Sequence, residues 1–298
     1  MPEQPRPETI GFIGFGAMGK RMALNLRRGG YVIAAYAPSR SSENNKEGVS
    51  FLASAQDVVR AAEIVVISLP NDKVVQRTAY GEDGFLAACH PGQLLINTST
   101  ISPQTALHLA EAARAQGVAV LDAPVSGSTP EAEAGELVVL VGGEAADVAR
   151  AQPIFDLIGK KTVHVGASGM GATMKLAVNG IMGQAYAGIS EAIGYGLAAG
   201  LDRATLFDTL EGLAVISPHH QRKLGLAADR HFSPQFPVKL MHKDLSLLLA
   251  DAGRLGMPMG SIAAATQLFA AARTQHDADD YACVVGMLED FAGNRPKD

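Results

Sequence analysis

The chain has 298 residues, of which 47% are hydrophobic and 5% aromatic, and its formal net charge is −5. This length allows two domains with ample material for a core. The charge balance, without any dense Lys/Arg block, argues against nucleic acid and anionic membranes as partners. Cys89 and Cys283 lie far apart without metal-ligand spacing, which fits a reducing compartment and packing roles.

The first half of the chain, up to about residue 165, alternates short apolar runs with amphipathic stretches. Residues 1–8 are polar and Pro-rich and show no signal-peptide pattern, so we expect a cytoplasmic protein. The alternation predicts βαβ units, and therefore an α/β fold with a doubly wound, largely parallel sheet. We expect strands at residues 10–13, 31–36, 64–69, 94–97, 119–121 and 137–141.

A glycine-rich turn follows the first expected strand and opens an amphipathic stretch. In this context the first glycine makes the tight turn, the second lets the backbone approach a pyrophosphate, and the third lets helix and strand pack closely. Small residues at such turns also arise for packing alone, but the strands on both sides favour a Rossmann-type dinucleotide site. The expected cofactor-binding residues here are Gly14, Phe15, Gly16, Ala17, Met18 and Gly19.

The end of the second expected strand distinguishes NAD from NADP. An acid there would bind the ribose hydroxyls of NAD, but residues 36–42 contain none. An arginine and hydroxyls would instead hold a 2′-phosphate. We therefore predict NADP(H) rather than NAD, with Arg40 as the main contact and Ser39 and Ser41 assisting. The alternative is that Arg40 is an ordinary exposed loop charge.

After residue 165 the pattern changes to long Ala/Leu/Gly-rich segments, expected as helices at residues 169–199, 202–213, 239–255 and 260–275. We therefore expect a dinucleotide-binding domain at residues 1–165 and an all-helical domain at residues 166–298, beginning with a long interdomain helix. Polar residues interrupt the longest apolar segment and argue against a membrane span. They are Lys175, Asn179, Gln184 and Glu191.

Lys175 stands in a run of small and apolar residues, with Asn179 four positions later. Residues four apart share a helical face, so the ammonium and the carboxamide should point at the same place. A buried lysine is unfavourable unless it has partners or a function. The alternative is a lysine whose stem packs on apolar surface while its head reaches water. This segment alone slightly favours the alternative, and the rest of the chain reverses that order.

Further motifs carry a resemblance. Residues 122–127 read Asp-Ala-Pro-Val-Ser-Gly, residues 169–175 read Gly-Met-Gly-Ala-Thr-Met-Lys, and residues 236–244 end in Lys243-Asp244. With Leu69-Pro70, Ser99-Thr100 and the glycine turn, they resemble the β-hydroxyacid dehydrogenase family from about residue 10 to 293. This family includes 3-hydroxyisobutyrate dehydrogenase and reductases of tartronate semialdehyde, glyoxylate and succinic semialdehyde. Ser128 departs from the common glycine, and Val178 precedes Asn179 where many members pair two asparagines, which leaves the substrate open.

The resemblance implies reversible hydride transfer between the nicotinamide and a small hydroxyacid or the matching aldehyde or keto acid. It also implies dimers or tetramers that pack through the helical domains. The residues that it assigns are Lys175 and Asn179 as catalytic, Ser126, Gly127, Ser128 and Lys243 as substrate-binding, and Leu69, Pro70, Ser99, Thr100 and Lys243 as cofactor-binding.

These residues can perform the chemistry without a metal ion. The ammonium of Lys175 would stabilise charge on the carbonyl oxygen and then supply the proton, and neutral Lys175 would take the proton back in oxidation. Asn179 would hold the substrate oxygen or orient the ammonium. The Ser126 hydroxyl and the amides of Gly127 and Ser128 would hold the substrate carboxylate.

Each assignment has an alternative. Residues 126–128 would also suit a plain turn between a strand and a helix. Asn179 could be a packed polar residue that bonds to backbone, and Lys243-Asp244 could be a solvated charge pair. For the whole chain, the alternatives are an imine reductase of the same architecture, which typically lacks this lysine, and a non-catalytic NADP-binding module.

Overall fold

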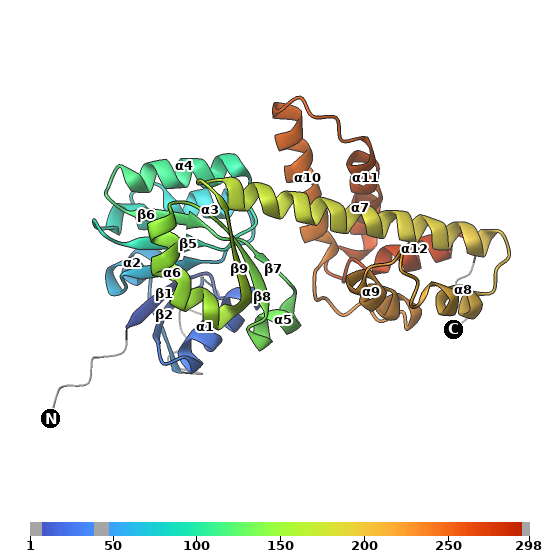
Figure 1. The fold of residues 1–298 in the computed structure, drawn as a ribbon, viewed down its shortest axis with the longest axis horizontal. Coiled ribbons are helices and arrows are strands. Elements are labelled where there is room, and N and C mark those ends of the chain that lie inside the picture. Colours follow the sequence, from blue (N-terminus) through green and yellow to red (C-terminus); the bar gives the residue numbers. More distant parts are fainter. Residues whose placement is uncertain (1–7, 39–47, 294–298) are drawn as a thin grey trace. The chain divides into compact units, whose positions relative to one another are not determined.

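The computed structural model describes residues 8–38 and 48–293 (Figure 1). The chain divides into two compact units, Met1–Lys175 and Leu176–Asp298, at a point inside the long helix α7 (Met170–Ala198). The predicted domains, residues 1–165 and 166–298, have their boundary before this helix rather than inside it. The two units are described separately.

The first unit is built on a sheet in which parallel pairing dominates (Figure 1). The strand order is β3-β2-β1-β4-β5-β6-β8-β7, with β9 paired to β8. The pairs from β3 to β6 are parallel, whereas β8 is antiparallel to β6 and β7. This confirms the predicted Rossmann-type, doubly wound, largely parallel sheet. The strands are β1 (Thr9–Ile13), β2 (Val32–Tyr36), β3 (Val49–Phe51), β4 (Ile64–Ile67), β5 (Leu94–Asn97), β6 (Ala119–Asp122), β7 (Val125–Ser126), β8 (Leu137–Gly142) and β9 (Gly159–Gly166).

Helices cover both faces of this sheet, which is why its central strands are apolar throughout. Phe12 of β1 packs in a core with Met22 and Phe155, whereas its neighbour Ile13 joins a second core with Leu109 on the opposite face. The helices are α1 (Ala17–Arg28), α2 (Ala55–Ala61), α3 (Asp72–Ala79), the short 3-10 helix η2 (Phe85–Ala88), α4 (Pro103–Arg114), α5 (Thr129–Ala134) and α6 (Ala145–Ile158).

The second unit is helical, as predicted, around a core that includes Tyr186, Phe269 and Tyr281. Besides α7 it contains α8 (Arg203–Leu210), α9 (Pro218–Ala228), α10 (Val238–Arg254), α11 (Gly260–His276) and α12 (Cys283–Phe291). Within the described ranges, no helix is both long enough and apolar enough to cross a membrane.

Helix α9 was not among the helices expected from the sequence, which left residues 214–238 without one. The side chain of Ser217 accepts a hydrogen bond from the backbone N–H of His220, and Pro218 occupies the first helical position. Both are helix-start signals, since the serine satisfies a free N–H and the proline lacks one. The signal was therefore present in the sequence.

Candidate active site

The turns after β1, β4 and β5 meet along one edge of the first unit's sheet. Ser68 donates its N–H to the carbonyl of Ile13 at 2.9 Å, and Leu69 donates its N–H to Ser99 Oγ at 2.9 Å. These are carboxyl ends of parallel strands, the edge at which open α/β sheets bind ligands. The structure therefore brings the glycine turn, Leu69 and Ser99 together, and Pro70 and Thr100 follow in the same turns.

The glycine turn has the shape that a pyrophosphate needs. Gly14 has φ +99°, and a Cβ on it would overlap the carbonyl oxygen of Ser68. A Cβ on Gly19 would overlap the carbonyl oxygen of Gly14. Gly16 begins α1 without a side-chain cap, faces open space, and has no acidic residue in the turn after it. An uncapped helix N-terminus with open access suits an anion, so these residues fit a dinucleotide phosphate.

The other predicted cofactor residues differ in what they can offer. Ala17 is exposed on the first turn of α1, and Met18 is half-buried. The ring of Phe15 packs edge to face on Phe51, with the centroids 5.1 Å apart, and is buried, so only its backbone can face a ligand. The predicted NADP contacts Ser39, Arg40 and Ser41 lie outside the described residues and stay a prediction.

The predicted carboxylate-holding loop runs from Ser126 at the end of β7 into α5. Ser128 is already engaged, because its N–H and its hydroxyl both donate to Glu131 Oε2, at 2.8 and 2.6 Å. Together with the contact of the Glu131 backbone N–H to the Ser128 side chain, this forms a capping box, which the Ser-x-x-Glu spacing could have revealed. Within this geometry, Ser126 and the N–H of Gly127 are left to hold a substrate carboxylate.

Asp122, at the end of β6, fixes the start of α7. Its two carboxylate oxygens accept hydrogen bonds from the backbone N–H groups of Gly169 and Ala172, both at 2.8 Å. Burial raises the pKa of Asp122, and these N–H bonds partly oppose the rise. Gly171 lies so close that a Cβ on it would overlap the backbone oxygen of Asp122. The helix that carries Lys175 is therefore fixed to the strand that leads into the Ser126 loop.

Lys175 and Asn179 lie on the buried face of α7, with 6% and 1% of their surfaces exposed. This burial argues against the alternative in which the lysine head reaches water. The Nδ2 group of Asn179 donates to Asp244 Oδ2 at 2.6 Å, and its Oδ1 has no hydrogen-bond partner among the described residues. A carboxylate only accepts hydrogen bonds, so the amide must turn its NH₂ toward Asp244 and its oxygen away.

Lys243 and Asp244 lie near the middle of α10, and Lys243 Nζ is 3.0 Å from Asp244 Oδ1. Asp244 is 1% exposed, so the alternative of a solvated charge pair is wrong for the acid. Sequence reasoning left Asp244 out of the site. Its helical position, three residues after buried Met241 and beside buried Leu245, could have predicted that its side chain faces the core.

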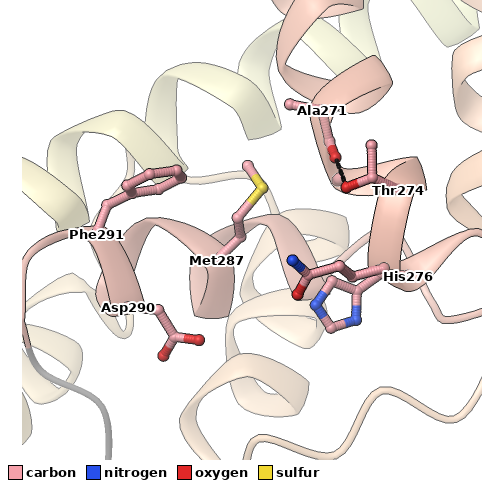
Figure 2. A pocket seen from close by; sticks show the side chains of 8 residues that line it. Ala271, Thr274, His276, Met287, Asp290 and Phe291 are labelled. Atoms are coloured by element: carbon pink, nitrogen blue, oxygen red, sulfur yellow. Dashed lines mark hydrogen bonds between the residues drawn. The ribbon is translucent and has the colours of Figure 1, made fainter.

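A cavity of about 510 Å³ lies elsewhere, between the last turns of α11 and α12 (Figure 2). Three of its polar side chains are bonded within the protein: Thr274 Oγ1 donates to the carbonyl of Ala271 at 2.8 Å, His276 pairs with Asp279, and Asp290 pairs with Arg230. None of the predicted site residues lines it. No group of three or more His, Cys, Asp or Glu residues suited to a metal ion occurs in the described part of the chain.

Comparison with known families agrees with this geometry over both units. Residues 9–166 match the model described as the NAD binding domain of 6-phosphogluconate dehydrogenase, and residues 169–288 match that described as NAD-binding of NADP-dependent 3-hydroxyisobutyrate dehydrogenase. The chain belongs to the β-hydroxyacid dehydrogenase family. This β-hydroxyacid dehydrogenase is an NAD(P)-dependent enzyme that acts on CH–OH groups.

Its similarity to individual relatives covers most of each chain. It is 34% identical over 291 residues to 2-(hydroxymethyl)glutarate dehydrogenase of Eubacterium barkeri, covering 95% of this chain and 96% of the relative. It is 36% identical over 267 residues to NAD-dependent L-serine dehydrogenase of Pseudomonas aeruginosa, covering 86% and 90%. The solved structure of 3-hydroxyisobutyrate dehydrogenase with L-serine, from Mycobacterium tuberculosis, is 31% identical with a TM-score of 0.85, covering 95% and 99%.

Proposed function

We propose that this β-hydroxyacid dehydrogenase uses NADP(H) to interconvert a small hydroxyacid and the matching aldehyde or keto acid, with Lys175 as general acid and base. Candidate substrates are 3-hydroxyisobutyrate, tartronate semialdehyde, glyoxylate and succinic semialdehyde. The observation that carries the proposal is the burial of Lys175 on one helical face with Asn179, on a helix fixed by Asp122. A buried lysine is unfavourable unless it has partners or a function, and strongly perturbed groups of this kind are common at functional sites.

The bound cofactor supplies or accepts the hydride. In reduction, the Lys175 ammonium stabilises the charge that develops on the carbonyl oxygen and donates its proton there. In oxidation, neutral Lys175 takes the hydroxyl proton. Asn179 Oδ1 accepts a hydrogen bond, either from the substrate hydroxyl or from the ammonium, because its NH₂ group is committed to Asp244.

The substrate carboxylate is held by the Ser126 hydroxyl and the Gly127 N–H, and Lys243 adds positive charge near substrate or cofactor. The substrates named for the three relatives share one chemical unit, a hydroxymethyl group on the carbon that bears a carboxylate. They differ in the third substituent of that carbon, which is a methyl group, an amino group or a second carboxylate arm. Of the candidate substrates we therefore favour 3-hydroxyisobutyrate and tartronate semialdehyde over glyoxylate and succinic semialdehyde, whose reduction products lack a hydroxymethyl group on the carbon that bears the carboxylate.

Lys175→Ala tests the mechanism. We expect kcat to fall about a thousandfold on every hydroxyacid that the wild type oxidises, because proton transfer by a positioned group contributes on that order. The affinity for NADPH, measured by fluorescence titration, should change little. Lys239→Ala, at an exposed position of α10, is the matched control and should leave kcat unchanged. A Lys175→Ala enzyme with a near-wild-type rate would refute this mechanism.

The same substrate panel separates the alternatives. Turnover of a cyclic imine without turnover of any hydroxyacid would indicate an imine reductase. Tight NADPH binding without turnover of either would indicate a non-catalytic module.

Arg40→Ala tests the cofactor preference. We expect kcat/KM for NADPH to fall toward that for NADH, because the guanidinium would no longer pair with the 2′-phosphate. Kinetics with both cofactors before and after the substitution measure this ratio, and an unchanged ratio would remove the assignment.

A further inference from the structure

The helix that follows the carboxylate-holding loop, α5, is fastened to α1, the helix that begins at the glycine turn. The Nδ2 group of Asn25 on α1 donates to the carbonyl of Ala132 on α5 at 2.9 Å. Arg28, three residues later on α1, donates from Nη2 to the carbonyl of Glu133 at 3.0 Å and also to Oδ1 of Asn25. Asn25 and Arg28 therefore form a clamp, which holds two neighbouring carbonyls of α5.

Helix α5 needs support of this kind. It has six residues, and a helix that short is not stable without tertiary contacts. The last four carbonyls of a helix have no partner inside it. The N–H of Gly135, which ends α5 with φ +72°, satisfies the carbonyl of Glu131. The next two carbonyls along α5 are those of Ala132 and Glu133, which the clamp holds.

The other end of α5 is continuous with the carboxylate-holding loop. Ser128 is the N-cap of α5, and the capping box joins it to Glu131. On the other side of the loop, Ser126 pairs with Val138 of β8. Gly127 lies between these two attachments with φ +132°, so the direction of its N–H depends on where β8 and α5 are held. The position of α5 depends in turn on the clamp.

We propose that Asn25 and Arg28 are positioning residues, which hold the loop of residues 126–128 in the geometry that binds the substrate carboxylate. This inference rests on the proposed function of the loop. Asn25 is 5% exposed and its amide is bonded within the protein through both Nδ2 and Oδ1, so it acts through α5 rather than by touching the substrate. One helix, α1, thus fixes both the glycine turn and the carboxylate-holding loop.

Asn25→Ala is the first test, because it removes the donor to Ala132. We expect KM for the hydroxyacid that the wild type prefers to rise about tenfold, which is the order of one lost hydrogen bond. The kcat at saturating hydroxyacid and the affinity for NADPH should change little, because Lys175 and the glycine turn are unaltered.

Gln93→Ala is the matched control for Asn25→Ala. Gln93 is also a buried amide, with 0% of its surface exposed, and it also holds carbonyls at the end of a helix. Its Nε2 donates to the carbonyls of Val59 and Ala62, at the end of α2, at 2.7 and 2.9 Å. Gln93→Ala should destabilise the fold as Asn25→Ala does and leave KM unchanged.

Arg28→Ala tests the clamp at a position where the fold is not at risk, because Arg28 is exposed. We expect KM to rise about threefold, since the bond to Glu133 is lost and the bond of Asn25 remains. Arg27→Ala is its control, because this neighbouring exposed arginine has its guanidinium beside Gly48. A folded Asn25→Ala with unchanged KM, an Arg28→Ala with unchanged KM, or an equal rise in the matched control would overturn the proposal.

Two measurements without turnover distinguish failure of the clamp from failure of the proposed function. Amide hydrogen exchange of residues 126–134 reports how firmly the loop and α5 are held. Calorimetry with propionate, an unreactive acid, on the NADPH-loaded enzyme reports the affinity for a carboxylate. Faster exchange and weaker propionate binding in Asn25→Ala, but not in Gln93→Ala, support the clamp even if Lys175→Ala refutes the proposed mechanism.

The opposite results separate the two kinds of failure. Unchanged exchange in Asn25→Ala would show that the clamp does not hold the loop. Faster exchange with unchanged propionate affinity, or a wild type that does not bind propionate, would show that the loop does not hold a carboxylate. Each of these results overturns the proposal.

Discussion

The carboxamide of Asn179 is held in one orientation because its NH₂ group donates to Asp244 Oδ2 at 2.6 Å. Two roles were possible for this residue from sequence alone. It could donate a hydrogen bond to a carbonyl oxygen, or accept one from a hydroxyl or an ammonium. The partner decides between these two roles, because an ionised carboxylate only accepts hydrogen bonds and therefore takes the NH₂ group of Asn179. Asp244 therefore acts as a positioning residue that fixes the orientation of the Asn179 amide, with Oδ1 turned away from Asp244.

Asp244→Asn should lower kcat about tenfold to a hundredfold while NADPH affinity stays constant. The new amide can donate as well as accept, so Asn179 is free to turn its NH₂ toward the substrate. Steady-state kinetics and fluorescence titration measure the two quantities. Asp251→Asn, on the same helix and paired with Arg254 at 3.0 Å, should leave kcat unchanged. Equal losses in both variants would show that α10 needs its charges only for folding.

The sequence predicted the part of this site that is local. Lys175 and Asn179 share a face because of helical spacing alone, and that spacing can be read directly. The Asn179–Asp244 hydrogen bond joins residues 65 positions apart and depends on how α7 packs on α10. The capping box of Ser128 and Glu131 is also local and could have been predicted from its spacing. The family resemblance instead assigned Ser128 to substrate binding.

At the scale of elements, the junction of β6 with α7 sets where the lysine is presented. Asp122 is 4% exposed and accepts the N–H groups of Gly169, just before α7, and of Ala172, in its first turn. A helix leaves such N–H groups without internal partners. Its carboxylate also places negative charge at the positive end of the helix dipole. Both effects stabilise the start of α7 in one position.

Asp122→Asn should lower the free energy of unfolding by about 1–3 kcal/mol, because one backbone N–H then faces an NH₂ group instead of an oxygen. Urea denaturation measures this change. Asp202→Asn is the comparison, since Asp202 caps the exposed start of α8 through the N–H of Thr205 at 2.9 Å and should show a smaller loss. A loss in Asp122→Asn no larger than in Asp202→Asn would contradict the role of this junction.

The histidine that joins α9 to α7 should make the helical unit sensitive to acid. His220 is buried, its Nε2 contacts the carbonyl of Met182 at 3.0 Å, and its Nδ1 contacts Ser217 Oγ at 2.9 Å. Burial lowers its pKa, and the bond to Met182 partly opposes this. The unfolded chain therefore binds a proton near the usual histidine pKa of about 6.5, while the folded chain does not.

It follows that stability falls as pH drops below about 6.5 toward the lowered pKa of the folded state. Urea denaturation between pH 8 and pH 5 measures this dependence. His220→Gln should flatten the profile, because glutamine can donate and accept without titrating. His231→Gln, at an exposed position, should leave it unchanged. A profile as steep in His220→Gln as in the wild type would assign the acid sensitivity to other groups.

Helices and strands with a clear hydrophobic periodicity or a continuous apolar run were predictable from the sequence. The other elements were not, because their sequences lack such a pattern. Strands β4 and β5 are buried at every position, and their sequences are apolar throughout except for Asn97 at the end of β5. Strand β9 begins with Gly159, Lys160 and Lys161 and has no fully buried residue, so its pattern resembles a polar connection. Strand β7 is too short for any period to appear.

At the scale of the whole molecule, the exposed side of α7 carries a regular seam. Exposed residues recur at alternating steps of four and three along the helix, which is the spacing of a helix that pairs with another helix. Ile181 and Tyr195 are the most exposed large apolar side chains on it, at 70% and 77%. The seam consists of Met170, Met174, Ala177, Ile181, Gln184, Gly188, Glu191, Tyr195 and Ala198.

We propose that this seam pairs with a second copy of the chain, in line with the predicted homodimer or homotetramer. Self-pairing suits a seam of small and apolar residues with few charges, since a two-fold interface brings the same patch together from both chains. Lys175 and Asn179 lie on the opposite, buried face of the helix, so pairing would leave them available for chemistry.

Ile181→Asp and Tyr195→Asp should each weaken self-association at least about thirtyfold, because a charge at the centre of an apolar interface removes an anchor and is itself desolvated. Sedimentation velocity over a range of protein concentrations measures the dissociation constant. Circular dichroism checks that each variant is folded, which the high exposure of both positions leads us to expect. Tyr80→Asp, an exposed aromatic substitution at the end of α3 in the first unit, should associate like the wild type. A monomeric wild type, or variants that associate as tightly as the wild type, would place the contacts between chains elsewhere than on α7.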